Sequence, residues 1–278
     1  MLNINDENQV PPKSLEGESA PNQFGVRDGD GITRDPCRVI FPILSHVNEE
    51  YKFIGTGFFI GQPGLFISAK HVLADVLNED GKPKGDLYIS QILPDSTSLL
   101  RPIHRFYTNG IDDIAVGICF QMKNNSDGSD LKNTQLKLTT EVPEIKSQVV
   151  TFAYPNTLKI NGNIDNQSFV FYPNFYSGTL EEYYPCGRDK VLLPGESFRT
   201  SIYLHPGSSG GPVFDNKGRV FAINTSSQDI KNISFVSSIK AILDIVIDDV
   251  NLMAGGPTFS LSIRELTKMG HLFVSGPI

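Results

Sequence analysis

The segment 207–212, GSSGGP, carries the residue types that acyl transfer to a serine requires. That reaction needs an exposed hydroxyl, a sharp backbone turn and amide N–H groups aimed at the developing oxyanion. Gly207 lies two residues before Ser209 and permits backbone conformations closed to other residues. Ser208 lacks such a glycine, so we expect Ser209 to be the nucleophile and the N–H groups of Gly207 and Ser209 to bind the oxyanion. Taken alone, the segment also fits a Gly/Ser turn between strands.

A candidate general base is His71, which follows the glycine-bearing run 55–60 and a stretch of small residues. A base of this kind works at the rim of a barrel, where its imidazole meets the substrate. A lone histidine is more often structural or merely exposed.

A candidate partner for the histidine is Asp113, which opens the apolar run 114–116. A carboxylate there is costly unless a charged or polar group pairs with it, and a catalytic histidine would satisfy it. Asp112 would point to the opposite face of a strand, so we prefer Asp113, on the face of Ala115. A turn aspartate before a strand is the simpler alternative.

The elements that must position these residues are mostly short strands. The chain contains 25 glycines and 18 prolines, which suits a fold with many turns. Hydrophobic residues make up 39% of it, which is enough to form a core. We expect a one-turn helix from His71 and helices at 238–248 and 263–269. The stretches 122–134 and 178–197 look like long polar loops. Strands are expected at 53–60, 65–68, 86–93, 111–120, 148–153, 168–175, 198–204, 212–214, 219–224 and 233–236.

Order and spacing place His71 and Asp113 in one β-barrel and Ser209 in the next. The chain resembles the trypsin-like (chymotrypsin-fold) serine peptidases from about residue 37 to residue 247. Within that family it is most similar to the HtrA-type peptidase domain, with no PDZ-like stretch following. The stretches that carry the resemblance are 55–57, 68–72, 113–115, 206–212 and 218–225.

The resemblance implies an all-β fold of two packed six-stranded antiparallel barrels with a C-terminal helix. The domain would span 36–250, with the His/Asp barrel at about 36–140 and the Ser barrel at about 141–250. A polar arm, 1–35, would precede it, and an extension, 251–278, would pack on it. Ser208 stands where zymogen-activated enzymes of the family carry an aspartate, so activation by an inserted N-terminus is not expected.

The resemblance also implies an activity, peptide-bond hydrolysis through an acyl-enzyme. Ser209 would attack, His71 would carry the proton, and Asp113 would orient His71. No cofactor or metal is implied. One alternative is a restrained peptidase effector that a protein partner switches on. Another is a pseudo-enzyme that keeps the barrels as a binding module.

The substrate pocket is placed by the same resemblance. Tyr203 occupies the position of the aspartate in trypsin, so preference for Arg or Lys is not expected. His205 is either a loop-shaping residue or one that favours acidic or amide side chains. The strand from Thr225 would pair with the substrate backbone. The expected substrate-binding residues are Tyr203, His205, Asn224, Thr225, Ser226, Ser227 and Ser234.

Composition excludes several classes of partner. The net charge is −7 and the pI about 5.2, and no basic stripe suggests nucleic-acid binding. No stretch reaches the length of a membrane span, and the polar N-terminus does not resemble a secretory signal, so we expect a cytoplasmic protein. Cys37, Cys119 and Cys186 are expected to be buried or half-buried thiols, with a zinc site as the minor alternative. The expected partners are a protein or peptide substrate and a regulatory protein.

Overall fold

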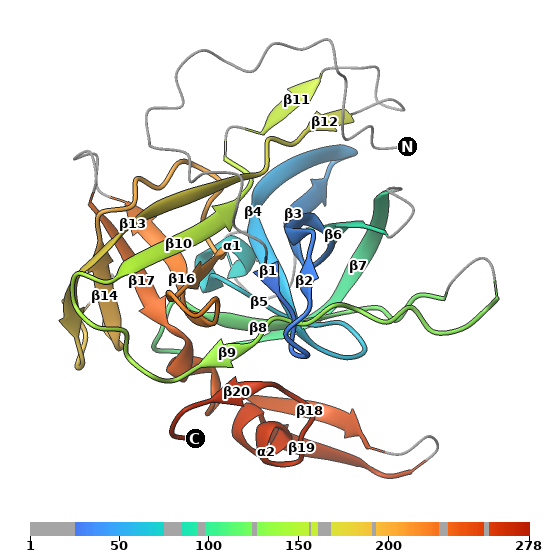
Figure 1. Ribbon diagram of the computed structural model, residues 1–278. Coiled ribbons are helices and arrows are strands. Elements are labelled where there is room, and N and C mark those ends of the chain that lie inside the picture. Colours follow the sequence, from blue (N-terminus) through green and yellow to red (C-terminus); the bar gives the residue numbers. More distant parts are fainter. Residues whose placement is uncertain are drawn as a thin grey trace.

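The computed structural model describes residues 26–278 except 75–84, 94–97, 124–126, 156, 161–167, 191–192, 228–232 and 253–255. Most of the described chain is strand, and Figure 1 shows two barrels side by side with a smaller C-terminal layer beneath them. The all-β expectation is confirmed. No helix among the described residues is long and apolar enough to cross a membrane.

The first barrel closes from six antiparallel strands in the order β3-β4-β5-β8-β7-β6. Its interior is aromatic: the ring of Phe41 lies 4.6 Å from that of Phe59 and 5.7 Å from that of Phe66. All three side chains are fully buried, and burying each one contributes about 1.5–3 kcal/mol. The strands are β3 (Ile40–Val47), β4 (Glu50–Gly61), β5 (Leu65–Ser68), β6 (Asp86–Ile92), β7 (Ser98–Tyr107) and β8 (Ala115–Cys119).

The second barrel has six strands in the order β15-β10-β13-β14-β17-β16, and a pairing between β15 and β16 closes it. A separate apolar cluster, including Phe198, Val213 and Val236, fills its interior. The strands are β10 (Gln148–Ala153), β13 (Asn174–Tyr184), β14 (Ser197–Thr200), β15 (Pro212–Phe214), β16 (Val220–Ser227) and β17 (Ser234–Ser238). Both predicted barrels are therefore present.

Shorter elements cover the barrels. Two hairpins are formed by β1 (Val26–Arg27) with β2 (Thr33–Arg34) and by β11 (Leu158–Ile160) with β12 (Ser168–Val170). β9 (Leu138–Thr139) pairs in parallel with β16 and with the last strand, β20 (Val274–Ser275). The remaining hairpin joins β18 (Val246–Asn251) to β19 (Thr258–Ser262), and two short 3-10 turns lie at Pro36–Arg38 and Ile239–Ile242.

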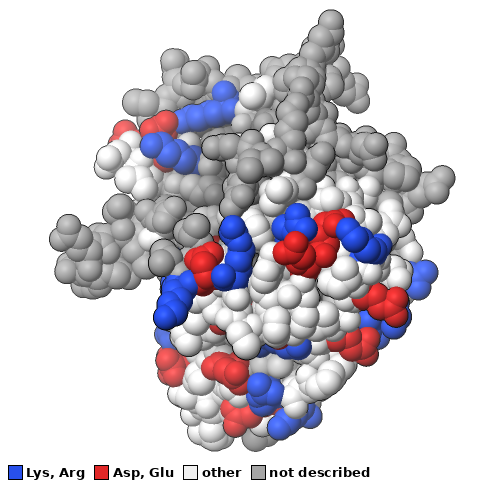
Figure 2. Space-filling view, turned by 90° about the vertical axis from the view of Figure 1, so that its left-hand side faces the viewer, with Lys and Arg blue, Asp and Glu red and all other residues white. Residues whose placement is uncertain are grey.

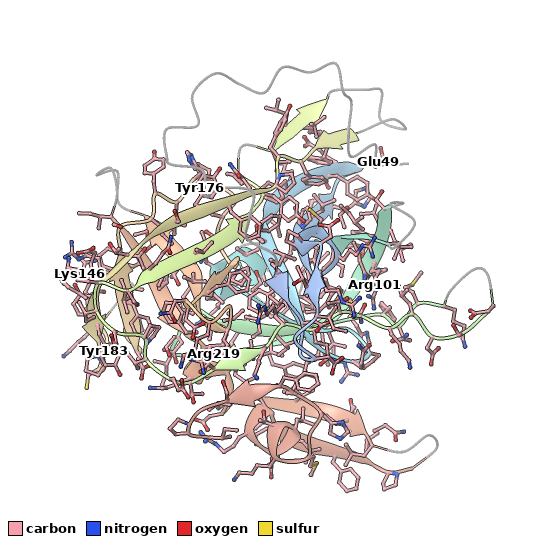
Figure 3. All side chains as sticks on the ribbon, in the orientation of Figure 1. Glu49, Arg101, Lys146, Tyr176, Tyr183 and Arg219 are labelled. Carbon is pink, nitrogen blue, oxygen red and sulfur yellow. The ribbon has the colours of Figure 1, made fainter. Side chains whose placement is uncertain are left out.

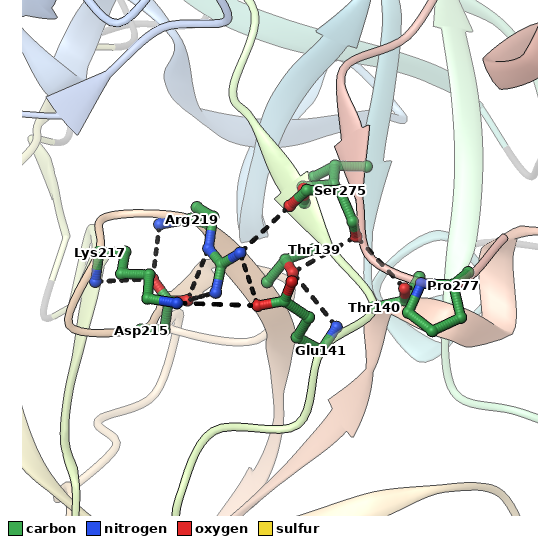
Figure 4. A network of polar contacts seen from close by, with 9 residues as sticks. Thr139, Thr140, Glu141, Asp215, Lys217, Arg219, Ser275 and Pro277 are labelled. Atoms are coloured by element: carbon green, nitrogen blue, oxygen red, sulfur yellow. Dashed lines mark hydrogen bonds and ion pairs between the residues drawn. The ribbon is translucent and has the colours of Figure 1, made fainter.

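A polar network fastens the C-terminal strand to the second barrel (Figure 4). Arg219 lies 2.7 Å from Asp215 Oδ2 and 2.8 Å from Glu141 Oε2, and it also donates to Ser275 Oγ at 3.3 Å. Burial lowers the pKa of Arg219, but its bonds to the carboxylates of Asp215 and Glu141 outweigh this effect, so the net pKa is raised. On the face shown in Figure 2, acidic and basic residues alternate over the surface without a large patch of one sign.

The C-terminal helix is confirmed as α2 (Ile263–Lys268), which a capping box of Ser262 and Glu265 begins. The helix predicted at 238–248 is wrong. Only a 3-10 turn forms there, after which Val246 and Ile247 enter β18. The apolar spacing of this segment fits either a helix or a short turn followed by a strand that is buried on one side. Pairing with β19 favours the turn and strand.

Two further expectations need correction. The supposed loop 178–197 begins as strand, because β13 continues to Tyr184. β7 was not predicted, since Pro102 and three basic residues interrupt its pattern. One of them, Arg101, is fully buried, and its guanidinium is satisfied by Gln91 Oε1 at 2.7 Å, Asn133 Oδ1 at 2.6 Å and backbone carbonyls (Figure 3).

Candidate active site

The pairing of β5 with β8 brings His71 and Asp113 to one end of the first barrel. The two strands are antiparallel, with Ser68 opposite Ala115. The chain therefore leaves β5 at the same end of the barrel at which it enters β8. His71 lies in the short helix α1 (Lys70–Ala74) just after β5, and Asp113 lies in the turn just before β8.

The carboxylate of Asp113 contacts His71 at two points. Its Oδ2 atom lies 2.7 Å from Nδ1 of the imidazole, and its Oδ1 atom accepts a hydrogen bond from the backbone N–H of His71 at 2.9 Å. The side chain of His71 is 39% exposed and that of Asp113 20% exposed. A carboxylate at Nδ1 keeps the proton on that nitrogen and leaves Nε2 as the basic atom, on a ring open to solvent.

The neighbouring Asp112 takes a different role. Its Oδ2 atom accepts a hydrogen bond from Asn109 Nδ2 at 2.5 Å, and its backbone N–H donates to Asn109 Oδ1. Its carboxylate packs on Gly195, where an added Cβ would lie 1.4 Å from Oδ1. Since β8 begins only at Ala115, both aspartates lie in a turn. Alternation along a strand therefore does not separate their roles; the hydrogen bonds do.

The turn that carries Ser209 is held by strands of both barrels. Gly207 and Gly210 have positive φ angles of 89° and 83°, which favour glycine. From the first barrel, Thr56 donates its hydroxyl to the carbonyl of Gly207 at 2.8 Å and its N–H to the carbonyl of Ser209 at 2.9 Å. From the second, the carbonyl of Asn224 accepts from Gly210 N–H at 2.8 Å.

This turn lies against the segment that leads into α1. A Cβ added at Gly210 would lie 2.2 Å from the carbonyl oxygen of Thr56, 2.3 Å from Ser68 Oγ and 2.8 Å from Ala69 N. The backbone of Ser209 is therefore packed beside the strand end from which His71 projects. The turn that carries Ser209 thus lies next to the segment that leads to His71, whose imidazole contacts Asp113.

The amides of Gly207 and Ser209 have no acceptor in the described part of the chain. The N–H groups around them do: Ser208 donates to His205 O at 3.1 Å and Gly211 to Ser208 O at 3.0 Å. The two expected oxyanion donors are thus not engaged by any other described residue. Ser208 is 2% exposed, and its hydroxyl has no hydrogen-bond partner among the described residues.

Several expected pocket residues have their side chains engaged inside the barrel. Ser234 Oγ lies 2.7 Å from Thr200 Oγ1, and Thr225 Oγ1 lies 2.8 Å from Ser237 Oγ. Asn224 Nδ2 donates to Thr151 Oγ1 at 2.7 Å. The side chains of these three residues are therefore engaged with other residues of the second barrel. Ser226 is half-buried, and the side chain of Ser227 lies outside what the structure describes.

His205 lies in an aromatic cluster. Its ring is 4.6 Å from that of Tyr203, edge to face, and 5.3 Å from that of Tyr176, which Figure 3 places on β13. Burial lowers the pKa of His205 and favours the neutral ring. Its Nε2 atom is buried and has no partner among the described residues.

Two carboxylates of β13 are paired with basic residues. Glu181 pairs with Lys146, and Glu182 lies 2.5 Å from Arg199. The bond with Lys146 lowers the pKa of Glu181, and a hydrogen bond from Tyr184, together with the charge of Arg199, lowers the pKa of Glu182.

The thiols do not form a site. Burial raises the pKa of Cys37 to about 12 and that of Cys119 to about 11. Cys186 is exposed, which corrects the expectation that it is at least half-buried, because it follows the end of β13 in a surface loop. The described residues hold no group of three or more His, Cys, Asp or Glu side chains placed to bind a metal.

Comparison with known proteins gives one family match. Residues 55–223 match the model of the trypsin-like peptidase domain. No curated protein matches the chain. The crystal structure of Deg5 is similar with a TM-score of 0.54 and 16% identity, covering 74% of this chain and 86% of that one. The active form of the Rv3671c protease from M. tuberculosis is similar with a TM-score of 0.50 and 16% identity, covering 86% and 84%.

Proposed function

The chain belongs to the trypsin-like peptidase family, and from this premise we propose that it is a serine endopeptidase acting through an acyl-enzyme. The observation that carries the proposal is the 2.7 Å contact of Asp113 with Nδ1 of His71, beside a turn that presents Ser209. In the family fold a histidine held in this way serves as a proton carrier for a neighbouring hydroxyl.

The proposed reaction begins with attack of Ser209 Oγ on the substrate carbonyl carbon. His71 Nε2 takes the hydroxyl proton, and Asp113 stabilises the imidazolium that forms. The carbonyl oxygen becomes an oxyanion, for which the N–H groups of Gly207 and Ser209 are the proposed donors.

His71 then gives its proton to the leaving amine, and the C–N bond breaks. Water, activated by the same imidazole, hydrolyses the ester to Ser209. Every proton in this cycle passes through His71, so the contact with Asp113 serves both halves of the reaction.

The experiment that tests the proposal is hydrolysis of an unstructured protein by the wild type and by Ser209→Ala. We expect wild-type cleavage and a loss in the variant on the order of 10⁴-fold or more, with an unchanged melting temperature. Binding of the same protein by both forms without cleavage by either would instead identify a binding module that retains the barrels.

A further inference from the structure

The ring of Phe53, on β4, presses on the backbone of Gly207. A Cβ built on Gly207 would lie 2.3 Å from Cε1 of Phe53 and 3.2 Å from the carbonyl oxygen of Tyr154. The φ angle of Gly207 is 89°. Gly207 thus has a left-handed conformation and is confined between an aromatic ring of the first barrel and the chain just after β10.

A second aromatic ring, that of Phe171, packs against the ring of Phe53. Phe171, which follows β12, lies edge to face with Phe53 at 6.0 Å and with Tyr154 at 5.9 Å. Phe171 is 3% exposed, and the hydroxyl of Tyr154 donates to the carbonyl of Ile40 at 2.6 Å. Edge-to-face pairs of this kind contribute beyond their buried area and orient the rings.

The hairpin of β11 and β12 is itself anchored to β4, the strand that carries Phe53. Lys159 on β11 lies 2.7 Å from Glu50 Oε1 at the start of β4. Figure 1 shows the hairpin lying over that end of the strand. The contacts therefore run without a break from the hairpin through Phe171 and Phe53 to Gly207.

We propose that Phe53 is a positioning residue for the amide of Gly207, and that the β11–β12 hairpin holds Phe53 in place through Phe171. The catalytic part of this inference rests on the proposed function. Oxyanion donors act only when they are held within a fraction of an ångström of the developing charge. Thr56 fastens the carbonyl of Gly207 by a hydrogen bond, and Phe53 limits how far its Cα can move.

The test compares Phe53→Ala, Phe53→Leu and Phe171→Ala with Phe106→Ala, a matched loss of a half-buried aromatic ring on β7. Hydrogen exchange is measured on a peptide covering 205–211, whose amides at Ser208, Gly210 and Gly211 are hydrogen-bonded. We expect at least about tenfold faster exchange in both alanine variants, a smaller change in Phe53→Leu, and no change in Phe106→Ala. Unchanged exchange in a β10 peptide shows that each variant is folded.

Peptide hydrolysis adds a second readout. We expect kcat to fall roughly 10- to 100-fold in Phe53→Ala with KM within about threefold, and Phe53→Leu to recover most of the loss. Exchange at 205–211 no faster than in Phe106→Ala would overturn the inference, whatever the activity. Faster exchange in a protein whose wild type hydrolyses nothing would support the positioning role and reject the proposed function.

Discussion

The hydroxyl of Thr56 donates a hydrogen bond to the carbonyl oxygen of Gly207 at 2.8 Å, across the junction of the two barrels. Thr56 is fully buried, and its N–H also binds the carbonyl of Ser209. Strand β4 of the first barrel thus holds the backbone of the serine turn directly. The two barrels are coupled at the point where the proposed chemistry occurs.

Thr56→Val tests this coupling. The substitution keeps the side-chain shape but removes the donor to Gly207 and leaves a carbonyl oxygen without its partner. We expect kcat to fall about 10- to 100-fold and the free energy of unfolding to fall by about 1–2 kcal/mol. Thr56→Ser, which keeps the hydroxyl, should retain most of the activity. Equal kcat values for the valine and serine variants would show that the hydrogen bond does not position the turn.

Asp113→Asn tests the partner of the histidine. An amide at this place keeps the volume but loses the charge that stabilises the imidazolium, and it permits the wrong tautomer of His71. We expect kcat to fall on the order of 10³- to 10⁴-fold.

The matched control is Asp112→Asn, whose carboxylate is bound to Asn109 rather than to the histidine. We expect this variant to lose less than about threefold in kcat. A larger loss in the Asp112 variant than in the Asp113 variant would reverse the assignment of the two aspartates.

Cleavage after Arg or Lys is not expected. Tyr203 offers no charge at the base of the expected pocket, and a buried cation without a counter-charge loses several kcal/mol of hydration. Glu181 and Glu182, two carboxylates of β13, are paired with Lys146 and Arg199. A fluorogenic series that varies only P1 should show Arg and Lys at least about tenfold below the best apolar residue in kcat/KM.

The same series decides the role of His205. Dominant cleavage after Arg or Lys would refute the uncharged pocket. Dominant cleavage after Gln or Glu would make the neutral imidazole of His205 a specificity residue, and His205→Phe should then remove that preference.

Several strands and the serine turn could be predicted from sequence because their signals are local, whereas the arrangement in two barrels came from the resemblance to trypsin-like peptidases. Strands such as 148–153 and 212–214 were bounded correctly, since each is a short apolar run between turn residues. β7 escaped prediction because its buried Arg101 is satisfied by Gln91 and Asn133, which lie outside the strand, 10 and 32 residues away in the sequence. The helix expected at 238–248 failed because pairing with β19 determines that segment, and apolar spacing does not reveal pairing.

Among the site residues, too, those with a local sequence signal could be predicted, and those defined by long-range contacts could not. Gly207 and Ser209 belong to a recognisable sequence segment. Gly55 and Gly57 likewise mark the strand that contains them, β4. The roles of Thr56 and Phe53 could not be predicted, because each contacts Gly207 from a strand about 150 residues earlier in the chain. Contacts at such separation exist only once both barrels have closed.

The most direct test of the account is the site of reaction with a fluorophosphonate, mapped by mass spectrometry on the intact chain. The reagent phosphonylates a serine only where a base removes its proton and donors stabilise the oxyanion. We predict a single adduct on Ser209 in the wild type, its absence in Ser209→Ala, and labelling slowed on the order of 10³-fold or more in His71→Ala. An unmodified Ser209 in the wild type, or equal labelling in the His71 variant, would contradict the account.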